Sequence, residues 1–177
     1  MERHRIWRVG ENIDTDALAP GAYMKMDLAD MAGHCLESRY PGLADALRPG
    51  DVIVAGAGFG IGSSREQAVG VLVRLGVRAV IAPSFSGLYF RNAFNLGLLA
   101  IVCPEAEQIP EGSEVEIDTE GSVLRLYDVK ANAGGRPSKI LACQKIPSFL
   151  VDMAAAGGLL AQLQRKFATS SSISIPN

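Results

Sequence analysis

The stretch "DVIVAGAGFGIGSSREQAVGVLVRLG" (Asp51–Gly76) joins an apolar segment to an amphipathic one through a turn rich in glycine. The continuous apolar run Val52–Ala55 is typical of a strand that is buried on both faces. After position 67 the apolar residues recur at helical spacing, and Gly76 stands where a helix would end. The pattern therefore predicts a strand, a turn and a helix in succession.

The next segment repeats this alternation. Residues 78–103 contain the apolar run "AVIA", a helical pattern "SGLYFRNAFNLG" that ends at Gly97, and a second apolar run "LLAIVC". Strands that alternate with helices indicate a parallel sheet with helices packed on it. Residues 114–128 instead alternate apolar and polar side chains around a "TEGS" turn, which indicates an added antiparallel β-hairpin. We therefore predict an α/β fold with a mostly parallel sheet flanked by helices.

The two ends of the chain extend this unit. Apolar alternation at Ile6–Val9 predicts a strand that feeds a polar loop, and the spacing over 28–38 predicts a short amphipathic helix. A C-terminal helix is expected to break at Gly157 and Gly158. We expect a single domain over residues 1–166 and a flexible C-terminal tail over residues 167–177.

Composition excludes several classes of partner. Lys and Arg are scattered along a 177-residue chain of formal net charge -2, so no basic stripe selects nucleic acid or an anionic membrane. The N-terminus lacks the apolar core of a secretory signal, and no apolar run approaches the length of a membrane span, so a cytoplasmic location is expected. The three cysteines are widely spaced and accompany only two histidines, which predicts neither a disulfide framework nor a metal site in this chain.

The glycine-rich turn does not match the common nucleotide-binding motifs. A dinucleotide fingerprint begun at Gly58 would need glycine where Ser63 stands, and a phosphate-binding loop would need a lysine that is absent. A serine-hydrolase elbow, G-x-S-x-G, does not occur either. The turn therefore has to be interpreted from its own residues.

Those residues favour a site for a small carboxylate. Ser63 or Ser64 is expected to cap the following helix, with Glu66 or Gln67 completing a capping box, so that backbone N–H groups face an anion. Arg65 would grip a carboxylate through two hydrogen bonds. The glycines up to Gly62 would let the backbone approach the ligand closely. The alternative is a simple helix start with Arg65 in solvent.

Three stretches resemble the swivel domain of the aconitase superfamily. "GFGIGSSREQA" is similar to its motif G-x-x-F-G-x-G-S-S-R-E-H-A, and "GENIDTDALAPGAY" is similar to N-I-D-T-D-x-I-x-P-x-x-Y. "VRAVIAPSFSGLYFRNAFNLGLLAI" resembles a third family block, and the resemblance runs from about Ile6 to Lys166. It implies a β/β/α swivel fold. A chain that holds this domain alone resembles the small subunits of isopropylmalate dehydratases and of homoaconitase-type enzymes.

The resemblance implies an activity that requires a second chain. Family members are hydro-lyases that isomerise 2-hydroxy di- or tricarboxylic acids by dehydration and rehydration, and the isopropylmalate enzymes serve leucine biosynthesis. Their [4Fe-4S] cluster is carried by a partner large subunit, in a heterodimer or heterotetramer, so this chain would bind none itself. Ser63 corresponds to the family's catalytic base, and Ser64 and Arg65 correspond to residues that bind the substrate carboxylate. Asp16, Gly62 and Glu66 would support them.

Substrate identity is less constrained by the motifs. Ile61 and Gln67 replace a cysteine and a histidine found in many members, at positions that do not carry the proton chemistry. The loop "YMKM", residues 23–26, corresponds to the part that faces the variable end of the substrate. Lys25 would pair with an additional carboxylate, as in homoaconitate, or lie in solvent, whereas its methionine neighbours suit an apolar isopropyl group. A non-catalytic anion-binding or regulatory module is the alternative from another class.

Overall fold

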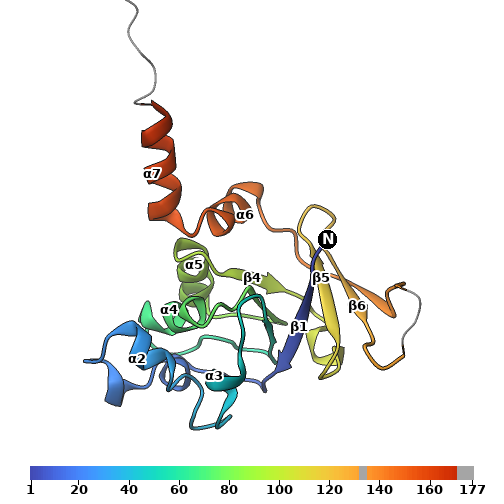
Figure 1. Cartoon of the computed structure of the whole chain (residues 1–177), viewed down its shortest axis with the longest axis horizontal. Helices are drawn as coiled ribbons and strands as arrows, with labels where there is room; N and C mark the ends of the chain where they lie inside the picture. The colour runs from blue at the N-terminus through green and yellow to red at the C-terminus, as the bar shows by residue number, and fades with distance from the viewer. Residues whose placement is uncertain (132–134, 171–177) are drawn as a thin grey trace, which may run out of the picture.

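The computed structural model describes residues 1–131 and 135–170, which form one mixed sheet with helices around it (Figure 1). The seven strands lie in the order β4-β3-β2-β1-β5-β6-β7. The parallel strands are β1 (Arg3–Arg8), β2 (Val52–Val54), β3 (Ala79–Ala82) and β4 (Leu99–Val102). The antiparallel strands are β5 (Glu114–Asp118), β6 (Val123–Tyr127) and β7 (Lys139–Ala142). The predicted α/β class and hairpin are confirmed, and β7 extends that hairpin to three strands.

Seven α-helices accompany the sheet in the described part of the chain. They are α1 (Thr15–Leu18), α2 (Leu28–Ala32), α3 (Leu43–Ala46), α4 (Gln67–Arg74), α5 (Gly87–Asn95), α6 (Ser148–Ala155) and α7 (Leu159–Ser170). Short 3₁₀ segments lie at Gly21–Tyr23 and Ala106–Gln108. The helix expected over 28–38 is shorter than predicted: it ends at Ala32 with Gly33 as its C-cap, and the left-handed backbone of Leu36 (φ 61°) excludes a helix that continues to residue 38. As predicted, left-handed Gly76 and Gly97 follow α4 and α5.

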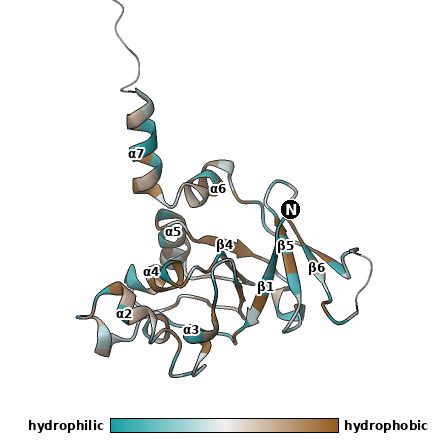
Figure 2. Cartoon of the chain, in the orientation of Figure 1, coloured by the Kyte–Doolittle hydropathy of each residue, from teal (hydrophilic) through white to brown (hydrophobic). Residues whose placement is uncertain are grey.

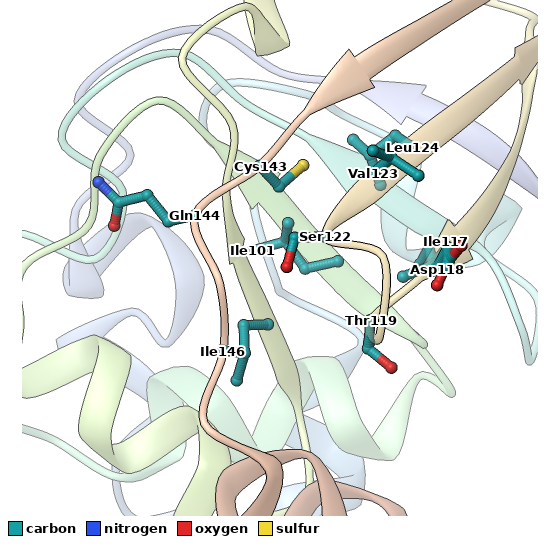
Figure 3. Close-up of a pocket in the computed structure, with 10 residues that line it drawn as sticks. All are labelled: Ile101, Ile117, Asp118, Thr119, Ser122, Val123, Leu124, Cys143, Gln144 and Ile146. Carbon is teal, nitrogen blue, oxygen red and sulfur yellow. The ribbon is translucent and has the colours of Figure 1, made fainter.

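The sheet curls until its two ends meet. Figure 3 shows a small cavity whose lining comes from β4, β5, β6 and the segment after β7, although β4 and β7 are the outermost strands. Gln144 N, just beyond β7, donates to Val102 O of β4 at 2.9 Å. The cavity measures about 10 Å³, which is room for about one water molecule. It is too small for an organic acid and is not the site.

The C-terminal helices lie beside α5 at one end of the molecule. The predicted break is confirmed, since Gly157 and Gly158 separate α6 from α7 with φ of 91° and 110°. Helix α7 stands away from the sheet and mixes polar and apolar residues, whereas β4 is hydrophobic (Figures 1 and 2). Of the tail expected over 167–177, residues 167–170 are helical and 171–177 lie outside the described residues. Within the described ranges, no helix combines the length and apolarity that crossing a bilayer requires.

Candidate functional site

The loops that follow β1, β2 and β3 meet at the carboxyl edge of the parallel strands. Isolated β-bridges join Asp14 to Ile61 and Phe59 to Phe85, so the glycine-rich turn after β2 lies between the other two loops. Gly58 N also donates to Ser84 Oγ at 2.9 Å. Ligands of open α/β sheets bind at this edge, outside the carboxyl ends of the strands.

The glycines of the turn are explained by contacts within the protein. A Cβ at Gly60, where φ is 81°, would lie 2.1 Å from Cγ of Tyr89 on α5. A Cβ at Gly62, where φ is 110°, would lie 2.9 Å from Thr15 Oγ1 on α1. These contacts require glycine at both positions even without a ligand, and the supporting role of Gly62 toward a substrate stays a prediction. The two glycines let the turn pack against its two neighbouring loops, which fixes the position of the residues that follow.

Ser63 is held by hydrogen bonds to two other residues. Its backbone N donates to Thr15 Oγ1 at 3.1 Å, and its Oγ lies 3.3 Å from the same hydroxyl. Arg65 Nε donates to Ser63 Oγ at 2.8 Å. The predicted capping box is wrong: α4 begins at Gln67, its N-cap residue is Glu66, and no side chain caps it. The Ser63 hydroxyl is instead directed to the donors that a reactive oxygen would need.

Arg65 lies between the turn and α1. Its Nη1 donates to Ala19 O at 2.8 Å and contacts Asp16 Oδ1 at 3.4 Å. The side chain of Asp16 is 70% exposed, and the same Oδ1 accepts the N–H of Gly21 at 2.9 Å. Within residues 1–131 and 135–170, Arg65 Nη2 makes no hydrogen bond. The guanidinium is thus oriented by the protein and keeps donors for an incoming carboxylate.

The structure brings together most of the predicted site residues. Ser63, Arg65, Asp16 and Gly62 share one corner, and exposed Ser64 adjoins them, with its carbonyl accepting a hydrogen bond from Asn92 Nδ2 at 3.3 Å. Asn92 and Thr15 were not predicted as site residues. Thr15 is 3% exposed, and its hydroxyl contacts the backbone N and the Oγ of Ser63. Its place inside the "N-I-D-T-D" match was the available signal.

Lys25 and Glu66 make no hydrogen bond to these residues in the described part of the chain; Glu66 lines a neighbouring groove, and Lys25 lies between two residues that line it. The groove measures about 320 Å³, and its lining residues are Met24, Met26, Leu28, Met31, Glu66, Gln67, Gly70 and Leu96. Lys25 is exposed between two of its methionines. Because the lining is mostly apolar and Glu66 directly follows Arg65 in the chain, the groove suits an apolar group next to a bound carboxylate.

The residues described here do not fit an iron–sulfur cluster. In residues 1–131 and 135–170, no three His, Cys, Asp or Glu side chains come together to hold a metal ion. Burial raises the pKa of the Cys35 thiol to about 12. A hydrogen bond with Cys103, together with burial, raises the pKa of Cys143. Fe–S clusters need thiolates gathered in one place, so no step of chemistry is assigned to a cluster held by these thiols.

Comparison with known proteins points to one family. The model of the Aconitase C-terminal domain matches residues 38–106. The 3-isopropylmalate dehydratase small subunit of Aquifex aeolicus is 40% identical over 170 residues, 94% of this chain and 96% of that one. The crystal structure of 3-isopropylmalate dehydratase from Methanocaldococcus jannaschii superposes with a TM-score of 0.83 and 34% identity, over 97% of this chain and 98% of the other.

Other relatives carry other substrate names. The isopropylmalate/citramalate isomerase small subunit of Methanocaldococcus jannaschii is 37% identical over 168 residues, 94% of this chain and 95% of the relative. The methanogen homoaconitase small subunit of Methanothermobacter thermautotrophicus is 44% identical over 124 residues, 70% of this chain and 72% of the relative. Identity of this order is therefore shared by relatives with different substrates.

Proposed function

Because the chain belongs to the 3-isopropylmalate dehydratase small-subunit family, within the aconitase superfamily, we propose that it supplies half of a hydro-lyase active site. The reaction is the isomerisation of a 2-hydroxy acid by dehydration and rehydration, and the proposed substrate is 3-isopropylmalate. The observation that carries the proposal is the 2.8 Å hydrogen bond from Arg65 Nε to Ser63 Oγ at the carboxyl edge of the sheet. A large subunit with a [4Fe-4S] cluster would complete the site, and a cytoplasmic location stays a prediction.

Ser63 is the proposed base that removes the proton next to a substrate carboxylate. A serine hydroxyl is a weak acid, so its oxyanion must be strongly stabilised before it can accept that proton. Arg65 Nε at 2.8 Å and the Thr15 hydroxyl at 3.3 Å are the two donors in place to do so. The remaining Nη donors of Arg65 and the exposed Ser64 would bind the carboxylate. The cluster, when bound on the partner, supplies a Lewis acid for the leaving hydroxyl.

The groove supports an apolar substrate branch over a charged one. Its methionine and leucine side chains are flexible apolar surfaces that accommodate an isopropyl group. Lys25 is the one feature that favours an additional carboxylate, and it lies in solvent at the tip of the loop. Isopropylmalate is therefore preferred, and a homoaconitase-type substrate is the second candidate.

Kinetics of Lys25→Val should separate the two candidates. If Lys25 pairs with a second carboxylate, the variant loses about 3- to 10-fold in kcat/KM for homoaconitate and nothing for isopropylmalate, as expected for an exposed ion pair. An unchanged ratio between the two acids removes Lys25 from substrate recognition. Lys145→Val, a change at another exposed lysine outside the groove, is the matched control.

Reconstitution tests the function itself. The chain is combined anaerobically with its cognate large subunit, and isopropylmalate, homocitrate and citramalate are offered in parallel. We expect the highest kcat/KM for isopropylmalate. Failure to turn over any of these acids, together with failure to copurify with an iron–sulfur chain, would refute the proposal and favour a non-catalytic anion-binding module.

A further inference from the structure

Three side chains next to the Lys25 loop form a bonded cluster that the proposed chemistry does not use. The rings of Tyr23 and His34 stack with centroids 3.8 Å apart and planes at 18°. His34 Nδ1 lies 2.8 Å from Glu37 Oε2. The interactions of Glu37 with His34, and secondarily with Tyr23, lower the pKa of Glu37, so its carboxylate stays charged. The cluster joins the 3₁₀ segment Gly21–Tyr23 to the segment that follows α2.

The segment that carries His34 and Glu37 is fixed to the core. Cys35 and Leu36, which lie between them, are each 1% exposed. Leu36 N donates to Ala17 O of α1 at 2.8 Å, and the left-handed Leu36 closes the turn. Because its buried residues anchor it to the same helix that carries Asp16, this segment is a rigid base on which Tyr23 can rest.

The loop is tethered at a second point on the side of the site. Gly21 N donates to Asp16 Oδ1 at 2.9 Å, and Ala19 O accepts from Arg65. Within the loop, Met26 N donates to Tyr23 O at 2.9 Å, so the position of Tyr23 is passed on to the residues that follow it. The part left between the tethers and α2 is the Met24–Met26 segment, which borders the groove.

We propose that Glu37, which bridges to Tyr23 through the stacked His34 ring, is a positioning residue that sets substrate choice by holding the Met24–Met26 segment in place beside the groove. The inference rests on the proposed function, since it assigns the groove to the variable end of the substrate. In the described residues no hydrogen bond links this cluster to Ser63. Loss of the bridge should therefore weaken substrate binding and discrimination while leaving the proton transfer at Ser63 intact.

The test uses the reconstituted holoenzyme with His34→Leu, Glu37→Gln and the double variant. Asp45→Asn, an exposed acid of α3, is the matched control. Loss of a hydrogen bond to a carboxylate is expected to raise KM for isopropylmalate about 5-fold or more, with kcat held within about twofold. The double variant should have a KM no higher than that of the more impaired single variant, because both changes act on the same bond between His34 and Glu37. The ratio of kcat/KM for isopropylmalate to kcat/KM for homoaconitate should move closer to one.

A second measurement is independent of activity. Hydrogen exchange of the backbone amides in residues 21–27 of the full chain should quicken in Glu37→Gln and His34→Leu but not in Asp45→Asn. Unchanged exchange, or an unchanged KM with unchanged discrimination, overturns the inference. A variant with a lowered Tm whose kcat falls equally for every acid would also overturn the inference, because it would show that Glu37 has only a structural role. If wild type turns over no acid at all, the proposed function fails, and the exchange result still decides whether Glu37 holds the loop.

Discussion

Two arginine–aspartate pairs lie at opposite edges of the same parallel strands. At the amino edge, Arg5 donates to both oxygens of Asp51, at 3.1 and 2.6 Å, and Asp51 also accepts from Trp7 Nε1 and from the backbone N–H of Arg48. At the carboxyl edge, Arg65 reaches Asp16 through a single 3.4 Å contact. Asp51 is 5% exposed, whereas the side chain of Asp16 is 70% exposed.

The difference in burial and in hydrogen bonding indicates that the Arg5–Asp51 pair stabilises the fold, whereas the Arg65–Asp16 pair is available to a ligand. A buried carboxylate must have its hydrogen bonds satisfied by the protein, and Asp51 accepts four. An exposed pair with one long contact adds little stability. The guanidinium of Arg65 instead gains its orientation from Ala19 O and Ser63 Oγ. Changes at the carboxyl edge should therefore affect activity, and changes at the amino edge should affect stability.

The largest effect on activity is expected from a change at Ser63. Ser63→Ala removes the oxygen that Arg65 Nε holds at 2.8 Å, and kcat of the reconstituted pair should fall by about 10³-fold or more, as for loss of a general base. Copurification with the large subunit and the free energy of unfolding should stay unchanged, because Ser63 is exposed. Ser38→Ala, at another exposed serine outside the site, should keep full activity. Near-normal turnover by Ser63→Ala would end the base assignment.

The sequence predicts those parts of the fold and of the site that depend on residues close together in the chain. The parallel strands, α4, α5 and the break at Gly157 follow from apolar periodicity and from glycine positions, which depend on near neighbours in sequence. Strand β7 could not be predicted in this way, because Lys139 begins it and Ile140 is exposed, so its residues do not alternate between apolar and polar. Its partner β6 supplies the hydrogen bonds, and that pairing is not visible in a single short segment.

In the site, the serines and Arg65 could be predicted from one stretch, but their contacts could not. Thr15 approaches Ser63 only because the loops after β1 and β2 are adjacent in the sheet. The predicted capping box was wrong because Ser63 Oγ contacts Arg65 Nε within the turn and the Thr15 hydroxyl across loops, and caps no helix. The contacts of Gly60 with α5 and of Gly62 with α1 are likewise not visible in the sequence of the turn alone.

A smaller effect, on stability, is expected at the amino edge. Asp51→Asn should lower the free energy of unfolding at pH 7 by about 2 kcal/mol, since it weakens a buried, charge-assisted network, while kcat per folded molecule stays unchanged. Burial by itself would raise the pKa of Asp51, but the hydrogen bonds from Arg5, Arg48 N–H and Trp7 outweigh it and lower that pKa. The lowered pKa gives a second test of the same residue.

A carboxyl group whose pKa is lowered by folding stabilises the protein above its ordinary pKa near 4, and that stabilisation is lost as the pH falls through the lowered value. Wild type should therefore lose stability on acidification below about pH 4, and Asp51→Asn should lose less. Urea unfolding at pH 7, 4 and 3 measures both effects. Equal acid sensitivity of the two proteins, or a loss of activity without a loss of stability, would contradict the assignment of this edge to stability.

A smaller effect on kcat than at Ser63 is expected at Thr15, the buried residue of α1 that contacts Ser63 at the carboxyl edge. Thr15→Val keeps the shape of the side chain but removes the hydroxyl that accepts from Ser63 N and faces Ser63 Oγ, so kcat should fall about 10- to 100-fold. Thr15→Ser keeps the hydroxyl and should recover most of that loss, although it removes a buried methyl group. A purely structural role would give the opposite order, with the serine variant the more damaged of the two. Measuring kcat and urea unfolding for both variants distinguishes these outcomes. If the Thr15 hydroxyl stabilises the Ser63 oxygen, Thr15→Ser has the higher kcat of the two variants even where it is the less stable one.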